Sequence, residues 1–196
     1  MMTDWQELEH KYMMHTVERV PLTLVKGRGA RVWDEAGRRY LDFVAGWAVN
    51  SLGHCHPAGV KAVQGQVETL IQVSNHFYSI PQVKLARILV ENSCLDKVFF
   101  SNSGAEANEA AIKIARLHGH AQGIEQPTIV VMEGSFHGRT LATLSATGNR
   151  KVQAGFEPLV SGFLRVPYND LDAIAAVAKN NQNVVAVLVE PIQGEG

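Results

Sequence analysis

Short apolar runs alternate with helical stretches from residue 97 onward, and this alternation limits the possible folds more than any other feature of the chain. The runs KVFFSN, TIVVME, FLRVP and VVAVLVE are rich in β-branched or aromatic residues, which predicts strands. Helices are predicted over residues 104–118 and 170–180, and a glycine-rich loop follows TIVVME. Apolar strands separated by helices are typical of a mainly parallel sheet covered on both faces, so we expect an α/β fold.

The region before this alternation has a different pattern. Residues 4–18 predict a short helix, and residues 22–43 alternate strand-like runs with glycine-containing turns, which predicts a small antiparallel meander. Two further helices are expected over residues 56–72, where Pro57 stands near the helix start, and over residues 81–93.

These patterns place a domain boundary near residue 55. We expect residues 1–55 to form the N-terminal helix and the meander as part of a small domain, and residues 56–196 to form the first part of a large α/β domain. The sequence stops directly after the apolar run VVAVLVE and a few loop residues. A parallel strand without a following helix leaves one sheet face uncovered, so we expect these residues to be the N-terminal portion of a longer protein.

The composition argues against several classes of partner. Hydrophobic residues make up 46% of the chain and charged residues 19%, which is ordinary for a folded protein. The formal net charge of -1 gives no basic field for nucleic acid. No apolar run approaches the roughly 20 residues that cross a bilayer, so we expect neither nucleic acid nor membrane as a partner. The two cysteines, Cys55 and Cys94, form no disulfide framework and suit a reducing cytoplasm.

The stretch SNSGAEANEAAIKIAR, residues 101–116, has the features of an anion site. Ser103 is a good helix N-cap, and Glu106 completes the pattern of a capping box. Gly104 and Ala105 leave the first N–H groups of the helix unobstructed, and the helix dipole favours an anion there. An ordinary capped helix is the simpler interpretation of this stretch alone. Nucleotide-binding glycine patterns are absent, so any anion is expected to be smaller than a nucleotide.

The motif GHCHP contains residue types that bind metals, but we do not expect a metal site there. Adjacent residues such as His54, Cys55 and His56 cannot all face one ion, and the sequence has no distant Cys or His cluster that would complete the coordination.

Four motifs together resemble the class III pyridoxal-phosphate-dependent aminotransferases, and within them the acetylornithine and ornithine aminotransferases. They are LDFVAGWAVNSLGHCHP, SNSGAEANEAAIKIAR, GSFHGRTLATLSATGN and VEPIQGEG, and in this order they cover essentially the whole chain. The resemblance implies the fold type I of pyridoxal-phosphate-dependent transferases, with a mainly parallel sheet, and a homodimer with active sites at its interface. It also implies pyridoxal 5'-phosphate as cofactor and a role in amino-acid metabolism, such as arginine biosynthesis.

The same resemblance assigns cofactor-binding roles. Gly104 and Ala105, with Ser103 beside them, would bind the cofactor phosphate, which identifies the anion expected at this helix. Phe136 would stack on the cofactor ring, because a flat apolar face fixes the ring without competing for its polar atoms. Glu190 matches a family glutamate near the cofactor, and it stands at the end of a predicted strand, where ligands of α/β sheets bind.

Three further residues match substrate-binding positions of the family. Arg139 would bind the substrate carboxylate remote from the transferred amine, a contact that suits a guanidinium group. Glu195 matches a glutamate near the substrate. Trp47 stands where the ornithine-specific branch has tyrosine, and its large apolar face favours an acylated or less polar ω-amino substrate.

The resemblance also says what these 196 residues lack. The Schiff-base lysine and the acid that binds the pyridinium nitrogen belong to strands after residue 196 in the family, so no catalytic residue is assigned and we expect the chain alone to be inactive. The best interpretation is an enzyme that transfers an amino group from N-acetylornithine to 2-oxoglutarate. Ornithine, GABA or another ω-amino acid as donor, a class III racemase or aminomutase, and a non-catalytic phosphate-binding α/β module stay open.

Overall fold

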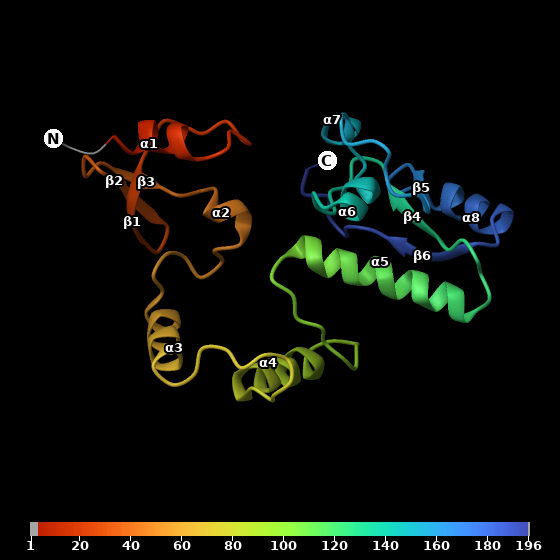
Figure 1. The fold of residues 1–196 in the computed structure, drawn as a ribbon, viewed down its shortest axis with the longest axis horizontal. Coiled ribbons are helices and arrows are strands. Elements are labelled where there is room, and N and C mark those ends of the chain that lie inside the picture. Colours follow the sequence, from red (N-terminus) through yellow and green to blue (C-terminus); the bar gives the residue numbers. More distant parts are fainter. Residues whose placement is uncertain (1–3, 196) are drawn as a thin grey trace. The chain divides into compact units, whose positions relative to one another are not determined.

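The structure is a computed structural model that describes residues 4–195 and divides into two compact units (Figure 1). The first unit extends to Val83 and the second begins at Lys84. This division comes later in the chain than the domain boundary expected near residue 55, which stays a prediction. Among the described residues, no helix combines the length and apolarity that crossing a membrane requires.

The first unit begins with helix α1 (Trp5–Tyr12). Asp4 caps it, because its Oδ1 accepts hydrogen bonds from the backbone N–H groups of Gln6 and Glu7. The helix is shorter than the predicted span 4–18. It buries none of its residues, so no packing stabilises a longer helix, and short helices are marginal without packing.

The predicted antiparallel meander is confirmed. It consists of strands β1 (Leu24–Arg28), β2 (Arg31–Asp34) and β3 (Arg39–Leu41), paired in that order. The buried Asp34 holds the second turn: its carboxylate accepts from the backbone N–H of Arg38 (2.8 Å), from Nε of Arg38 (2.6 Å) and from the hydroxyl of Tyr40 (2.9 Å). Burial alone raises the pKa of Asp34, but these hydrogen bonds hold it below its ordinary value.

Three helices follow the meander: α2 (Ala45–Ala48), α3 (Pro57–Val67) and α4 (Ile80–Glu91). The sequence predicts α3 and α4, and Pro57 takes the first helical position as expected. It does not predict α2, in which all four residues have positive φ angles: 48° at Ala45, 61° at Gly46, 61° at Trp47 and 63° at Ala48. This turn is therefore left-handed.

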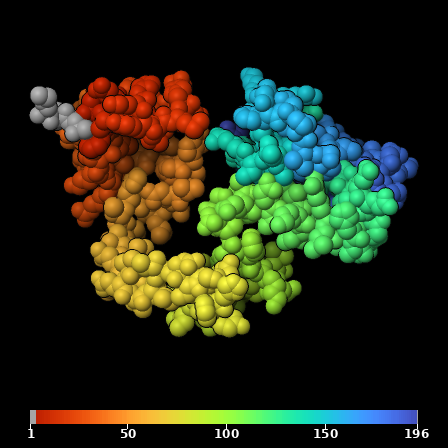
Figure 2. Space-filling model, viewed as in Figure 1, coloured from red at the N-terminus to blue at the C-terminus, as the bar shows by residue number. Residues whose placement is uncertain are grey.

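The second unit contains the predicted parallel sheet, which is confirmed. Strands β4 (Thr128–Met132), β5 (Phe163–Val166) and β6 (Val184–Leu188) pair in the order β5-β4-β6, and both pairings are parallel. The helices of this unit are α5 (Gly104–Ala121), α6 (Leu141–Ala146), α7 (Arg150–Gln153) and α8 (Leu171–Asn180). Figure 2 shows side chains of α5, in green, at the surface of the unit.

The core lies on both faces of the central strand β4, as the alternation of strands and helices predicts. On one face, Ile129 and Val131 pack with Ile112 of α5 and Ala146 of α6. On the other face, the buried residues of β4 and β5 pack against α8; they are Val130, Met132 and Val166. Because the strands are parallel, the loops that follow all three strands leave the same edge of the sheet.

Two predictions for this unit are wrong. Residues 97–102, KVFFSN, do not form a strand: no described strand pairs with them, and Phe99 is 70% exposed. A strand needs a neighbour for its N–H and C=O groups, and the predicted apolar run has none here. The glycine-rich loop after β4 contains the two short helices α6 and α7, and a side chain of α7 bonds to the end of α6. Gln153, buried in the unit, donates its side-chain amide to the carbonyl groups of Leu144 and Thr147.

Gly148 provides a test of this packing. A Cβ atom at this position would lie 2.4 Å from the carbonyl oxygen of Met132 and 2.6 Å from the N atom of Gly134, both of which are backbone atoms. We expect Gly148→Ala to lower the free energy of unfolding by about 1–3 kcal/mol, because backbone must move to make room. Urea unfolding measures this change. Gly65→Ala is the control, since a Cβ there meets nothing within 4 Å; equal stability of Gly148→Ala and wild type would contradict the packing.

Candidate active site

The first turn of α5 is capped as the sequence predicts. Oγ of Ser103 accepts a hydrogen bond from the backbone N–H of Glu106 at 3.2 Å. The carboxylate of Glu106 in turn receives the hydroxyl of Ser103 (3.1 Å) and the side-chain amide of Asn102 (3.2 Å). The Asn102 amide, followed by the Ser103 hydroxyl, lowers the pKa of Glu106. This arrangement fixes the start of the helix.

The start of α5 is also open on the side of Gly104. A Cβ atom added at Gly104 would meet no atom within 4 Å, so no other part of the described chain fills this space. The first N–H groups of a helix have no partner inside the helix, and α5 has 18 residues that align their peptide dipoles. The site can therefore hold an anion at the helix N-terminus.

The loop that follows β4, residues 133–140, lies against this helix start. The side-chain amide of Asn108 donates to the carbonyl oxygen of His137 at 2.8 Å. Gly138 has a φ angle of 130°, and a Cβ atom there would lie 2.9 Å from Cβ of Ala105. The hydroxyl of Thr140 bonds to the carboxylate of Glu109. The structure thus brings the predicted phosphate-binding residues and the predicted ring-stacking loop together.

Glu190 connects this loop to the end of β6. Its Oε2 accepts a hydrogen bond from the backbone N–H of Phe136 at 2.9 Å. The hydroxyl of Tyr168 donates to the carbonyl oxygens of Glu190 (3.2 Å) and Pro191 (2.9 Å), which fixes the chain after β6. Glu190 and Phe136, predicted from separate motifs, are therefore direct neighbours at the carboxyl ends of the strands, where ligands of such sheets bind.

Arg139 lies beside Phe136. Its guanidinium carbon is 5.7 Å from the centre of the Phe136 ring, within the range of a cation–π contact. Phe136 is 37% exposed and Arg139 is exposed. An aromatic face and a cation are thus available to a ligand side by side.

The sequence reasoning missed His137, which stands between these two residues in the chain. His137 is 4% exposed, and its Nε2 has no hydrogen-bond partner among the described residues. Burial lowers the pKa of His137, the charge of Glu190 opposes this effect, and the charge of Arg165 adds to it. The imidazole is therefore neutral at pH 7. The available signal was its position between Phe136 and Gly138, inside a motif already assigned to the site.

The two remaining predicted residues are Glu195 and Trp47, and each is described within its own unit. Glu195 is exposed and makes no side-chain hydrogen bond or ion pair among the described residues. Trp47 belongs to the first unit, where it is 79% exposed on the left-handed turn α2.

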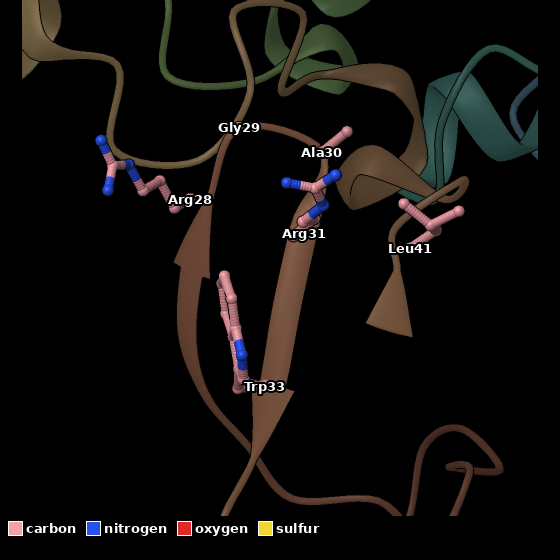
Figure 3. A pocket seen from close by; sticks show the side chains of 6 residues that line it. All are labelled: Arg28, Gly29, Ala30, Arg31, Trp33 and Leu41. Atoms are coloured by element: carbon pink, nitrogen blue, oxygen red, sulfur yellow. The ribbon is translucent and has the colours of Figure 1, made fainter. Parts of the chain in front are cut away.

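A hollow of about 590 Å³ also lies in the first unit, beside the meander (Figure 3). None of the predicted site residues lines it; its lining residues are Arg28, Gly29, Ala30, Arg31, Trp33 and Leu41. Figure 3 shows the two arginine side chains pointing in separate directions, so they do not converge on one ligand. Among residues 4–195, no group of three or more His, Cys, Asp and Glu side chains could hold a metal ion.

Comparison with known proteins identifies relatives that match most of the chain. Residues 12–196 match the family model described as aminotransferase class-III. An acetylornithine aminotransferase of Nitrosomonas europaea is 60% identical over 185 residues, which are 94% of this chain and 47% of that protein. The chain thus spans about half the length of the curated relatives it matches.

Solved structures agree with this match. The crystal structure of the ornithine aminotransferase from Toxoplasma gondii is 34% identical, with a TM-score of 0.92 over 97% of this chain and 46% of that chain. A taurine:2-oxoglutarate aminotransferase from Bifidobacterium kashiwanohense, solved in complex with PLP and glutamate, is 26% identical, with a TM-score of 0.84 over 95% of this chain and 47% of that chain. The sequence motifs, the fold and these matches agree, and the chain belongs to the class-III aminotransferase family.

Proposed function

We propose that this chain supplies the cofactor-binding and substrate-binding residues of an aminotransferase that uses pyridoxal 5'-phosphate (PLP). The observation that carries the proposal is the set of hydrogen bonds that gathers the start of α5, the loop 133–140 and Glu190 at one edge of the sheet. The name of the taurine:2-oxoglutarate aminotransferase structure includes PLP and glutamate. It supports PLP as the cofactor and a 2-oxo acid as the acceptor of the amino group.

The residues present fit the two parts of this cofactor. The phosphate needs unobstructed N–H donors, and the open side of Gly104 at the capped start of α5 leaves room for it. The ring needs a flat apolar neighbour, and the partly exposed Phe136 provides one. The buried and unpartnered Nε2 of His137 offers one more polar atom beside them. When bound, PLP accepts the amino group of one substrate and passes it to the next.

The chain's own residues have distinct parts in this mechanism. Ser103, Gly104 and Ala105 hold the phosphate through the helix N-terminus, and Phe136 keeps the ring in one orientation. Glu190 fixes the position of the Phe136 backbone through its hydrogen bond, so the stacking face stays in place. Arg139 binds the carboxylate of the substrate that is remote from the transferred amine.

N-acetylornithine is the amino donor that we favour, with 2-oxoglutarate as the acceptor. The name of the Nitrosomonas relative supports this donor, and the apolar face of Trp47 suits an acylated side chain. Glu195 completes the proposed substrate residues. Ornithine is the second candidate donor, because the Toxoplasma neighbour is an ornithine aminotransferase.

We further propose a homodimer in the cytoplasm. Helices α3 and α4 bury none of their residues, and several of their large apolar side chains are exposed; they include Val63, Val67, Val83, Ile88 and Leu89. Such a surface is typical of an interface. Cys55 and Cys94 are both free and exposed, which suits a reducing compartment.

The function is tested by measuring glutamate formation in the full-length enzyme that contains these residues. We expect activity with 2-oxoglutarate and a kcat/KM for N-acetylornithine that exceeds those for ornithine and GABA by tenfold or more. Activity with ornithine above N-acetylornithine would reassign the donor. Racemisation of a substrate without any need for 2-oxoglutarate would contradict the aminotransferase assignment.

The phosphate site is tested at Gly104. Gly104→Asp places a carboxylate where the phosphate binds, so like-charge repulsion is expected to weaken cofactor retention tenfold or more. The helix itself is not weakened, because an acidic residue in the first turn favours the helix dipole. Cofactor absorbance after dialysis measures the effect. Gly104→Asn is the matched control, because asparagine has the size of aspartate without its charge, and it should retain more cofactor than Gly104→Asp.

The carboxylate contact is tested at Arg139. Arg139→Lys keeps the charge but loses the planar fork, whereas Arg139→Ala loses both and should cost about 2–5 kcal/mol in substrate binding. We expect kcat/KM to fall from wild type through the Lys variant to the Ala variant. A donor amine without a carboxylate should be nearly unaffected. Equal losses for both kinds of donor would show that Arg139 supports the cofactor or the fold instead.

A further inference from the structure

The left-handed turn α2 is the most strained segment of the described backbone. Its four consecutive residues have φ angles between 48° and 63°, and only one of them, Gly46, lacks a side chain. L-residues avoid this region, so such a turn persists only where the surroundings hold it. Three backbone bonds close it: Ala48 N–H donates to Val44 O (3.0 Å), and the N–H groups of Val49 and Asn50 donate to Ala45 O. The turn projects Trp47 into solvent, with 79% of its surface exposed.

One carboxylate holds the beginning of this turn. Oδ1 of Asp42 accepts hydrogen bonds from the backbone N–H groups of Val44 (3.0 Å) and Ala45 (2.9 Å). Oδ2 of the same residue lies 2.8 Å from Nε2 of His54. The Ala45 N–H, followed by the His54 ring, lowers the pKa of Asp42. Asp42 is therefore a carboxylate with one oxygen on the strained turn and the other on His54.

His54 is in turn attached to the meander. Its N–H and C=O groups form a two-way backbone bridge with Gly29, at 2.9 Å and 2.8 Å. Its ring packs against Gly27, where a Cβ atom would lie 2.5 Å from Cγ of His54. Gly53 has a φ of 78°, and a Cβ there would lie 3.0 Å from the Gly29 backbone. These glycines leave the space that the His54 ring and backbone occupy.

We propose that Asp42 and His54 are positioning residues for the amino donor, because they fix the turn that presents Trp47. The inference rests on the proposed function, in which Trp47 contacts the donor. It also gives His54, the first histidine of GHCHP, a role other than metal binding. Asp42 and His54 touch no substrate themselves in this proposal; they act through the indole.

The alternative is a clamp that stabilises the fold without influencing the donor. The two interpretations differ in how mutations combine. If Asp42 acts through Trp47, then once Trp47 is removed, mutation of Asp42 has no further effect on donor kcat/KM. The effects of the two mutations are then not additive. If Asp42 only stabilises the fold, the effects of the two mutations on donor kcat/KM multiply.

A double-mutant cycle in the full-length holoenzyme tests this. We expect Asp42→Ala and His54→Ala each to lower kcat/KM for N-acetylornithine tenfold or more, and to change kcat/KM for 2-oxoglutarate less than threefold. In a Trp47→Ala background, Asp42→Ala should change donor kcat/KM less than twofold. His54→Gln can still donate to Asp42 and should restore most of the activity.

Asp34 provides the matched control. It is a buried carboxylate of the same meander with three hydrogen bonds, none of them to the turn that carries Trp47. Asp34→Ala should lower the unfolding midpoint without selective loss of donor kcat/KM. The same selective loss in Asp34→Ala, or multiplicative effects of the Asp42 and Trp47 changes, would overturn the proposal.

Hydrogen exchange separates this inference from the proposed function. In peptides spanning residues 42–50, the amides of Val44 and Ala45 should exchange faster in Asp42→Ala than in wild type, whatever reaction the enzyme catalyses. Unchanged exchange would overturn the clamp even in an active enzyme. Faster exchange in an enzyme that transfers no amino group from any donor would instead refute the proposed function, and the donor role of the pair with it.

Discussion

Burial of β4 on both faces is the constraint on which the second unit depends. Ile129, Val130, Val131 and Met132 are at most 2% exposed, and their side chains alternate between the α5–α6 side and the α8 side. Parallel neighbours and helices on both faces follow from this burial, because only crossover connections can link parallel strands. The same geometry directs the ends of β4 and β6 to one edge. The candidate cofactor residues meet there because the core requires it.

Buried polar groups need hydrogen-bond partners, and this need determines the conformation of the loop that follows β4. The short helix α6 ends inside the unit, so its last carbonyl groups need donors. Gln153 and the guanidinium of Arg165 supply them, with Arg165 Nη2 2.9 Å from the carbonyl oxygen of Thr147. Thr147 in turn holds the loop after β4, because its Oγ1 accepts a hydrogen bond from the backbone N–H of His137 at 3.0 Å. The loop that carries Phe136 is thus held by hydrogen bonds to Thr147 as well as to Glu190.

Local signals made much of this structure predictable. The cap at Ser103, the antiparallel meander and three of the four predicted apolar strands depend on local sequence patterns, and these predictions are confirmed. The errors share another cause. Residues 97–102 have the composition of a strand but no described partner, and the end of α6 is bonded to Arg165, which lies 18 to 20 residues further along the chain. The left-handed turn at Trp47 has no local signature, because three of its four residues ordinarily avoid that conformation. The candidate site was predictable mainly through its motifs, whereas His137 became visible only through its burial.

The two units hold their candidate functional residues by different physical means. In the second unit, the candidate phosphate and ring residues are themselves exposed or half-buried, and hydrogen bonds from Asn108, Thr147 and Glu190 hold the loop that carries Phe136 beside the packed sheet. In the first unit, Trp47 stands on a turn that buries none of its residues and is held by a few polar bonds from Asp42. A substitution at the exposed indole costs little packing. The frame of the candidate cofactor site thereby depends on the packed core, whereas the frame of the proposed donor contact depends on a few polar bonds.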